Sequence, residues 1–316
     1  MTTRYERALG SLLGSFVGDA IGAQTEFKTE KEVKRQFPDG IKEMDTANRY
    51  VGEAGEITDD SEMAIMLILS ILKQKQYQQS DARRSYIQWR DSGPSDIGIT
   101  IFGALDGAFN PQSQANGALM RITPIGILGN LLSTTTVVHL AEDDCAITHC
   151  NPVCRDCNRL FALAISLAIG KGWNTEEVYA YLLNAAPFIV KEKSVIEALG
   201  NARREEPKGI DGPYKGWVLI AFQLALHTVL TTSSFEEGME KIIMKAGDAD
   251  TNAAIYGALA GAFATKAGIP ERWVQALKIS PCMKRILGNT RSSLPNLASK
   301  WVEELLALPV ASYPYL

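Results

Sequence analysis

Apolar residues recur at three- and four-residue spacing along most of the chain, which is the period of one face of an α-helix. Strict alternation of apolar and polar residues is scarce, and the run at 134–138 is β-favouring but short and isolated. The pattern therefore predicts an all-α protein. We expect its longest helices at 4–22, 61–76, 81–90, 158–170, 175–185, 192–201, 215–230, 235–245, 252–267 and 270–278.

Polar residues mark where several of these helices begin. The pairs Ser80-Asp81 and Ser233-Ser234, together with Asn174, are candidate N-caps, since their side chains can accept hydrogen bonds from free backbone N–H groups. The turn-rich stretch at 205–213 reads as a surface loop between two helices. No Pro/Ser-rich linker divides the chain, so we expect one domain over residues 1–316.

Glycines recur every four residues in two of the predicted helices. An interior glycine costs about 1 kcal/mol relative to alanine, so a whole stripe indicates that another helix approaches closely. A membrane-embedded dimer face is disfavoured because charged residues flank both stripes. We expect two central helices, packed tightly in one core, carrying Gly10, Gly14, Gly18 and Gly22 in one case and Gly257 and Gly261 in the other.

Composition and charge narrow the class of protein. The hydrophobic fraction is 46% and the charged fraction 22%, typical of a globular protein with a substantial core. A net charge of −4 without a basic run disfavours nucleic-acid binding. The polar N-terminus lacks the apolar core of a signal peptide, and charged or glycine residues interrupt every longer apolar run. These features predict a cytoplasmic protein with no membrane or nucleic-acid partner, and we expect a monomer.

Four of the five cysteines cluster around one histidine: Cys145, Cys150, Cys154 and Cys157 flank His149. Their spacing allows an iron–sulfur or zinc site. However, Cys154 and Cys157 fall in a predicted amphipathic helix, and no second Cys/His pair follows. We favour the interpretation that these cysteines are small buried hydrophobic residues.

Two short acidic clusters, each with a threonine, sit at the starts of predicted helices. Taken singly, such a cluster is explained as an N-cap with acids that favour the helix dipole. If two clusters converge, their carboxylates repel one another unless cations neutralise them, and Mg²⁺ prefers oxygen ligands of this kind. The sequence therefore suggests a two-metal site formed by Thr58, Asp59 and Asp60 with Asp248, Asp250 and Thr251.

A second polar group lies between the two clusters. Asp96-Ile97-Gly98 precedes an apolar helix, and Ser113 to Gly117 forms a Ser/Asn/Gly loop before another. Backbone N–H groups at such helix starts suit a phosphate or diphosphate. Ordinary turns and caps explain the same residues. His149 has the same ambiguity, because an isolated histidine is commonly structural.

The glycine stripes, the two acidic clusters and the polar group between them occur in an order along the chain that resembles the ADP-ribosylglycohydrolases. The resemblance runs from about residue 8 to about residue 273, and motif order, spacing and helix context all agree. One small departure is Ala246-Gly247, where the family often has Gly-Gly. The matching segments are 14–22 with Glu26, 58–63, 96–98, 116–121 with Pro124, 148–149, and 247–252 with Gly257 and Gly261.

The resemblance implies an all-α domain that holds two Mg²⁺ or Mn²⁺ ions in a cleft. Thr58, Asp59 and Asp60 would supply ligands from one side, and Asp248, Asp250 and Thr251 from the other. Glu26 would approach the metals, and Glu26, Asp60 and Asp96 are the candidate catalytic carboxylates. The candidate residues for the diphosphate and distal ribose are Gly98, Ser113, Asn116, Gly117 and His149.

The activity implied by the resemblance is hydrolysis of the bond between ADP-ribose and a modified protein side chain. The Asp-Ile-Gly motif favours arginine as that side chain, so the substrate is an ADP-ribosylated protein and the product ADP-ribose. Serine-linked ADP-ribose and O-acetyl-ADP-ribose remain alternative substrates. A binding or immunity protein without turnover is a second class. A structural descendant is disfavoured, because unpaired buried acids are costly.

Overall fold

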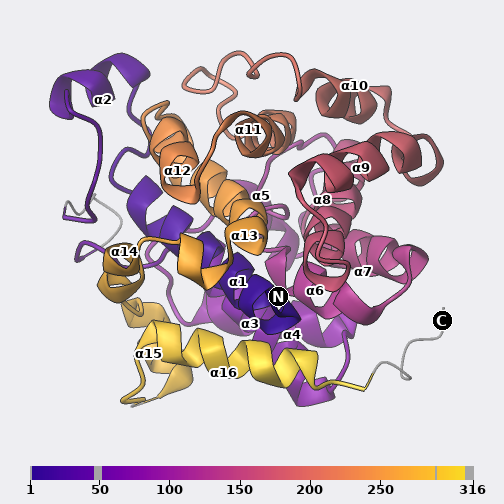
Figure 1. Cartoon of the computed structure of the whole chain (residues 1–316). Helices are drawn as coiled ribbons and strands as arrows, with labels where there is room; N and C mark the ends of the chain where they lie inside the picture. The colour runs from indigo at the N-terminus through magenta and orange to yellow at the C-terminus, as the bar shows by residue number, and fades with distance from the viewer. Residues whose placement is uncertain (1, 46–51, 289, 310–316) are drawn as a thin grey trace.

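The computed structural model describes residues 2–45, 52–288 and 290–309 (Figure 1). Those residues contain no strand, only two isolated β-bridges, so the predicted all-α fold is confirmed. The helices of the first half are α1 (Arg4–Gly22), α2 (Glu30–Gln36), α3 (Asp59–Gln74), α4 (Gln79–Asp91), α5 (Ile99–Leu105), α6 (Thr123–Leu128), the 3₁₀ turn η1 (Gly129–Leu131), α7 (Thr134–Ala146) and α8 (Pro152–Gly170). The second half contains α9 (Thr175–Ile189), α10 (Lys193–Asn201), α11 (Val218–Thr231), α12 (Phe235–Ile243), α13 (Ala249–Gly268), α14 (Glu271–Ala276), α15 (Pro281–Leu287) and α16 (Leu294–Leu306).

Helices α1 and α13 lie side by side at the centre of the molecule (Figure 1). A Cβ atom added to Gly14 would run into the carbonyl oxygen of Gly257, and one at Gly257 would run into that of Gly14. Gly10 and Gly261 are related in the same way. The prediction from the two glycine stripes is therefore confirmed, and the two backbones touch because no side chain separates them.

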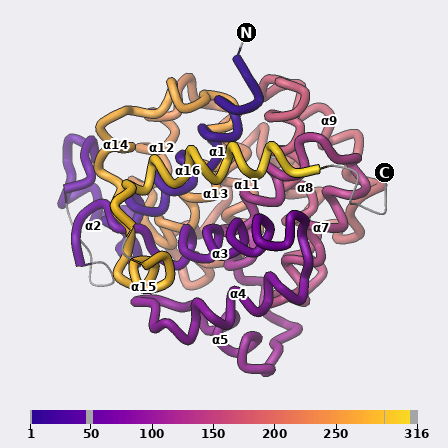
Figure 2. The backbone as a smooth tube through the Cα atoms, turned by 90° about the horizontal axis from the view of Figure 1, so that it is seen from below, coloured from indigo at the N-terminus to yellow at the C-terminus, as the bar shows by residue number. Residues whose placement is uncertain are grey.

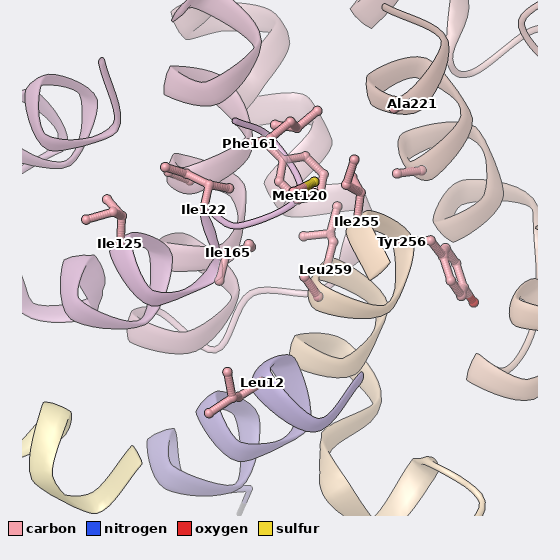
Figure 3. Packing of buried hydrophobic residues seen from close by; sticks show 14 of the residues in the cluster. Leu12, Met120, Ile122, Ile125, Phe161, Ile165, Ala221, Ile255, Tyr256 and Leu259 are labelled. Carbon is pink, nitrogen blue, oxygen red and sulfur yellow. The ribbon is translucent and has the colours of Figure 1, made fainter. Parts of the chain in front are cut away.

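The other helices surround this central pair. Helix α16 crosses α1 on one face, and α3, α4 and α5 lie beneath it in the view of Figure 2. Figure 3 shows Met120, Phe161, Ile255 and Leu259 converging between α8 and α13, with Leu12 contributed by α1. One continuous hydrophobic cluster thus connects both halves of the chain. No helix among the described residues is long and apolar enough to cross a membrane.

The predicted helix starts have mixed outcomes. Asn174 and Ser234 are N-caps that accept hydrogen bonds from the N–H groups of Glu177 and Glu237, as expected. The prediction at Ser80-Asp81 is wrong: α4 starts at Gln79, and the Asp81 carboxylate instead accepts a hydrogen bond from the Ser70 hydroxyl at 2.9 Å. The stretch at 205–213 is a loop, as predicted.

The segment at 134–138 forms the first turn of α7 despite its β-branched residues. Ser133 caps this helix by accepting a hydrogen bond from the N–H of Thr136, and Val137 is buried in the core. Capping and burial therefore override the weak strand preference of threonine and valine. The periodic pattern likewise did not predict α15 and α16, which follow the last expected helix.

Candidate active site

The starts of α3 and α13 meet at a cavity of about 440 Å³. The acidic lining comes from four separate parts of the chain. One residue lies in the loop after α1, one at the start of α3, one before α5, and two at the start of α13. The five carboxylates are those of Glu26, Asp59, Asp96, Asp248 and Asp250. The fold thus brings the two acidic clusters to one place.

On the α13 side, the side chains of Glu26, Asp248 and Asp250 each offer a carboxylate oxygen within 4.8 Å of the others. Two backbone hydrogen bonds align the segments that carry them. The N–H of Phe27 donates to the carbonyl of Gly247 at 2.7 Å, and the N–H of Gly247 donates to that of Lys28 at 3.0 Å. Glu26 is therefore held beside the first turn of α13.

The backbone immediately before Asp248 is left-handed at two successive residues, with φ of +59° at Ala246 and +73° at Gly247. A left-handed glycine carries little strain, whereas alanine in this region costs about 1 kcal/mol or more. A Cβ at Gly247 would also collide with the carbonyl oxygen of Ile210. This turn directs Asp248 toward the cavity, and Ala246 occupies the position where the related motif often has glycine.

On the α3 side, a buried carboxylate from α1 holds the cluster in place. Asp19 accepts hydrogen bonds from the N–H of Thr58 at 3.0 and 3.1 Å and from the N–H of Ser61 at 3.2 Å. The Thr58 hydroxyl also lies 2.7 Å from Asp19 and 3.1 Å from Asp60. Asp19 thus satisfies N–H groups that the start of a helix leaves without partners.

Burial raises the pKa of Asp59, Asp60 and Asp250 well above the ordinary value, and repulsion between neighbouring carboxylates raises each further. Burial also raises the pKa of Asp248, although hydrogen bonds from Asn116 and Thr251 oppose the effect. The Oδ1 atom of Asp60 is buried without a hydrogen-bond partner among the described residues. Divalent cations would relieve both features, so this oxygen-rich set fits metal ions.

One wall of the cavity is a short antiparallel pairing between two loops. The N–H of Asn116 donates to the carbonyl of Gly216 at 3.0 Å, and the N–H of Val218 donates to that of Gln114 at 2.9 Å. The Asn116 side chain donates to Asp248 at 2.6 Å. A Cβ at Gly216 would lie 3.3 Å from the Asp248 carboxylate. The paired loops therefore touch the α13 cluster directly.

A second cavity of about 510 Å³ adjoins the first, since Ala115 and Gly216 line both. Its walls carry two aromatic side chains, Tyr214 and Trp217, which are 77% and 40% exposed. The indole N–H of Trp217 donates to the Gln114 side chain at 2.7 Å and so fixes the ring. The acidic cavity thus has a neighbouring aromatic cavity of a different chemical character, with Ala115 and Gly216 between them.

His149 lies fully buried against the acidic cavity. Arg121, itself paired with Asp144 at 3.0 Å, donates to the Thr148 hydroxyl, which lies 2.8 Å from Nδ1 of His149. Since arginine can only donate, the threonine proton is available to Nδ1, which leaves the histidine proton on Nε2. Burial, aided by the Arg121 charge, lowers the pKa of His149 to about 3. The His149 ring is therefore neutral, and its Nε2 atom has no hydrogen-bond partner among the described residues.

Most of the residues singled out from the sequence line the acidic cavity, including Gly98, Asn116, Gly117, His149 and Thr251. Three do not. Thr58 lies in a narrow adjoining gap, and Asp60 lies behind it. Ser113 bonds through its hydroxyl to that of Thr100 at 2.8 Å, so in this structure it supports the loop instead of facing the cavity.

Three of the four clustered cysteines are buried near the loop at 113–117, and Cys150 is partly buried. Cys145, Cys154 and Cys157 are free thiols whose pKa values burial raises, in the case of Cys154 to about 12. The Cys154 thiol donates to the carbonyl of Ala115 at 3.4 Å. Among the described residues, the acidic group of Glu26, Asp248 and Asp250 is the set that meets a metal-binding geometry. The cysteines therefore pack beneath the loop, as the sequence interpretation favours.

Sequence reasoning assigned no site role to Asp19, Lys215 or Trp217. Asp19 lies within the glycine-rich stretch of α1, and an acidic residue on an otherwise apolar helix face could have marked it as a candidate site residue. Lys215 and Trp217 fall within the helix predicted at 215–230, whereas α11 starts only at Val218 and leaves them in the loop before it. Only the pairing of that loop with residues 114–116 places them at the cavities.

The similarity to known proteins agrees with this geometry. The family model for ADP-ribosylglycohydrolase matches residues 1–308. The chain is 29% identical to ADP-ribosyl-[dinitrogen reductase] glycohydrolase of Rhodospirillum rubrum over 290 residues, covering 86% of this chain and 90% of the relative. It is 25% identical to an ADP-ribosylarginine hydrolase of Pseudomonas putida over 321 residues, covering 96% and 81%.

A solved structure named as an ADP-ribosylglycohydrolase-related protein complex superposes with a TM-score of 0.80. Its sequence is 26% identical, and the match covers 96% of this chain and 98% of that one. Members of the matched family hydrolyse glycosidic linkages of ADP-ribose. Family model, relatives and fold agree across nearly the whole chain, and the protein belongs to the ADP-ribosylglycohydrolase family.

Proposed function

We propose that this protein is a metal-dependent hydrolase that releases ADP-ribose from ADP-ribosylated arginine side chains of proteins. The observation that carries the proposal is the convergence of five carboxylates on one cavity, with an aromatic cavity adjoining it. ADP-ribose has a matching division, with a sugar at one end and a flat base at the other. The aromatic rings of Tyr214 and Trp217 suit the base, which stacks on such surfaces.

The carboxylates suit the distal ribose and a pair of Mg²⁺ or Mn²⁺ ions. Glu26, Asp248 and Asp250 would hold cations on the α13 side, with Thr251 beside them, and Asp59, Asp60 and Thr58 on the α3 side. When bound, such ions orient the sugar hydroxyls and make water a better nucleophile. Asp19 and Asn116 position the two clusters through the hydrogen bonds described above.

Hydrolysis forms a bond between a water oxygen and the anomeric carbon while the bond from that carbon to the side-chain nitrogen breaks. One proton leaves the water, and one proton must reach the departing nitrogen. A carboxylate at the cavity performs each transfer well because it is fixed within reach of the sugar. Glu26 and Asp96 line the cavity and are our candidates for these roles. Asp60, the third acid singled out from the sequence, lies behind Thr58, so we assign it to the metal ions instead. Asp96 is half-buried at the cavity and follows an exposed loop, so it can also face the substrate's guanidinium.

We favour arginine over serine because the cavity lining is rich in carboxylates. A modified arginine retains a delocalised guanidinium whose donors match carboxylates, whereas a serine linkage brings no charge. The relative from Pseudomonas putida is named as an ADP-ribosylarginine hydrolase, which agrees with this choice. The relative from Bos taurus is named as an ADP-ribosylhydrolase, and its identity is 24%.

The test measures free ADP-ribose released from arginine-modified and serine-modified proteins with Mg²⁺, with Mn²⁺ and with chelator. We expect release from arginine, none with chelator, and a loss of at least about 100-fold in Asp250→Asn, the upper range for disturbed metal sites. Asp39→Asn, at an exposed acid that lines neither cavity, is the matched control. Tight binding of ADP-ribose without turnover on any linkage, O-acetyl-ADP-ribose included, would favour a binding protein instead.

A further inference from the structure

Lys215 lies at the junction of the two cavities. It lines the acidic cavity, and the next residue, Gly216, lines both. Among the described residues that line either cavity, no other lysine or arginine occurs. His149 adds no charge because it is neutral. The walls therefore carry five carboxylates and one basic side chain.

The ammonium of Lys215 is held in place without a direct ion pair, although its charge is near enough to oppose the rise that burial causes in the pKa of Asp248. It lies 5.2 Å from the centre of the Phe27 ring, a cation–π contact that spans from the loop after α1 to the loop before α11. Phe27 has a left-handed backbone with φ of +59° and is 44% exposed. Within the described part of the chain, no carboxylate forms an ion pair with Lys215. Its three N–H donors thus remain available to a ligand.

We infer that Lys215 binds the diphosphate of ADP-ribose at the junction between the two cavities, an inference that rests on the proposed function. With the base against Trp217 and the distal ribose at the carboxylates, the linking diphosphate must cross beside Ala115 and Gly216. At that point the acidic wall repels an anion. A lysine there supplies the opposite charge and charge-assisted hydrogen bonds to phosphate oxygens.

The experiment measures the affinities of the full-length protein for ADP-ribose and for ADP by calorimetry in the presence of Mg²⁺. We expect Lys215→Gln to weaken both by about tenfold or more, the size expected for losing one charged hydrogen bond. Lys215→Arg should retain most of the affinity. Lys208→Gln removes the same charge from an exposed position of the same loop and should change little. The difference between wild type and Lys215→Gln should shrink as KCl rises, since salt screens a charge effect.

Three outcomes would overturn the role of Lys215: unchanged affinity in Lys215→Gln, an equal loss in Lys208→Gln, or a loss that Lys215→Arg shares and salt does not alter. The last pattern would indicate that Lys215 shapes the loop without binding the ligand. Wild-type protein that binds neither ADP-ribose nor ADP would instead refute the proposed function itself. The two failures are therefore distinguishable.

Discussion

The starts of α3 and α13 carry nearly matching acidic clusters, yet the protein supports them in different ways. At α3, the Asp19 carboxylate on α1 accepts hydrogen bonds from backbone N–H groups of the cluster, so buried hydrogen bonds fix the cluster in place. At α13, Asp248 follows a left-handed turn and is held by Asn116 from a loop. Only Asp59 of the α3 cluster lines the cavity, whereas all three members of the α13 cluster line it. Two helix starts with similar sequences can therefore be held in place by different kinds of contact.

The largest expected effect is a difference in stability between variants that lose the Asp19 contact and variants that lose the Asn116 contact. Asp19→Ala removes the acceptor of two buried N–H groups and of the Thr58 hydroxyl, and should lower the free energy of unfolding by about 3 kcal/mol. Asn116→Ala should cost about 1 kcal/mol, because it removes a single hydrogen bond beside a cavity. Denaturant unfolding of both variants measures the difference. Equal losses would show that the α3 cluster is no more firmly built than the α13 cluster.

The pH dependence of stability tests the carboxylates of both clusters together. Without metal, burial and mutual repulsion hold the pKa of Asp59, Asp60 and Asp250 above the ordinary value. Above about pH 4 the folded protein therefore binds more protons than the unfolded chain. The stability that these three carboxyl groups contribute is fully present below about pH 4, and it is lost as the pH rises through their raised pKa values.

Chelated protein should therefore become less stable from pH 5 to pH 8. Mn²⁺ should stabilise the protein more at pH 8 than at pH 5, because metal ions bind ionised carboxylates. Thermal unfolding with chelator and with Mn²⁺ at both pH values provides the measurement. A chelated protein whose stability increases over this range would contradict the coupling between the clusters.

Asp60→Asn should separate stability from function at the α3 side. Removing one of several repelling buried carboxylates should raise the stability of the chelated protein by about 1 kcal/mol, while Mn²⁺ should no longer stabilise it fully. Hydrolysis should fall in parallel with the loss of metal stabilisation. A variant that is destabilised in chelator and still hydrolyses normally would show that Asp60 serves the fold alone.

The smallest expected effect concerns the turn before α13. Ala246→Gly removes a side chain from a residue with φ of +59° and should raise stability by about 0.5 kcal/mol, after the entropy cost of glycine in the unfolded state. Ala202→Gly, at the αR C-cap of α10, is the control and should destabilise. Loss of stability in Ala246→Gly would mean that its methyl packing outweighs the strain.

Much of the helical framework could be predicted because it depends on local pattern. The glycine stripes of α1 and α13 identified a close helix pair, and the periodic segments identified most of the longer helices. The start of α4 and the helix α7 were less predictable, since Asp81 and Val137 take their roles from distant partners. Local preference is weak where tertiary contacts decide.

The residues of the candidate site also fall into those that could be predicted from the sequence and those that could not. The carboxylates at both helix starts stand out in the sequence because they share a short spacing. Asp19 and Lys215 do not, since their importance depends on contacts between segments far apart in the chain. Ser113 shows the opposite case: its residue type predicts a ligand contact, and in this structure its hydroxyl bonds that of Thr100.

The contact between Gly14 and Gly257 has a consequence for how the chain acquires its structure. These residues come from opposite ends of the sequence, so the pairing of α1 with α13 closes a very long loop and adds heavily to the contact order. A chain emerging from the ribosome cannot form this pair until α13 has been synthesised. We expect slow, late assembly of the centre, with the apolar, glycine-bearing face of α1 exposed to chaperones until α13 has been made.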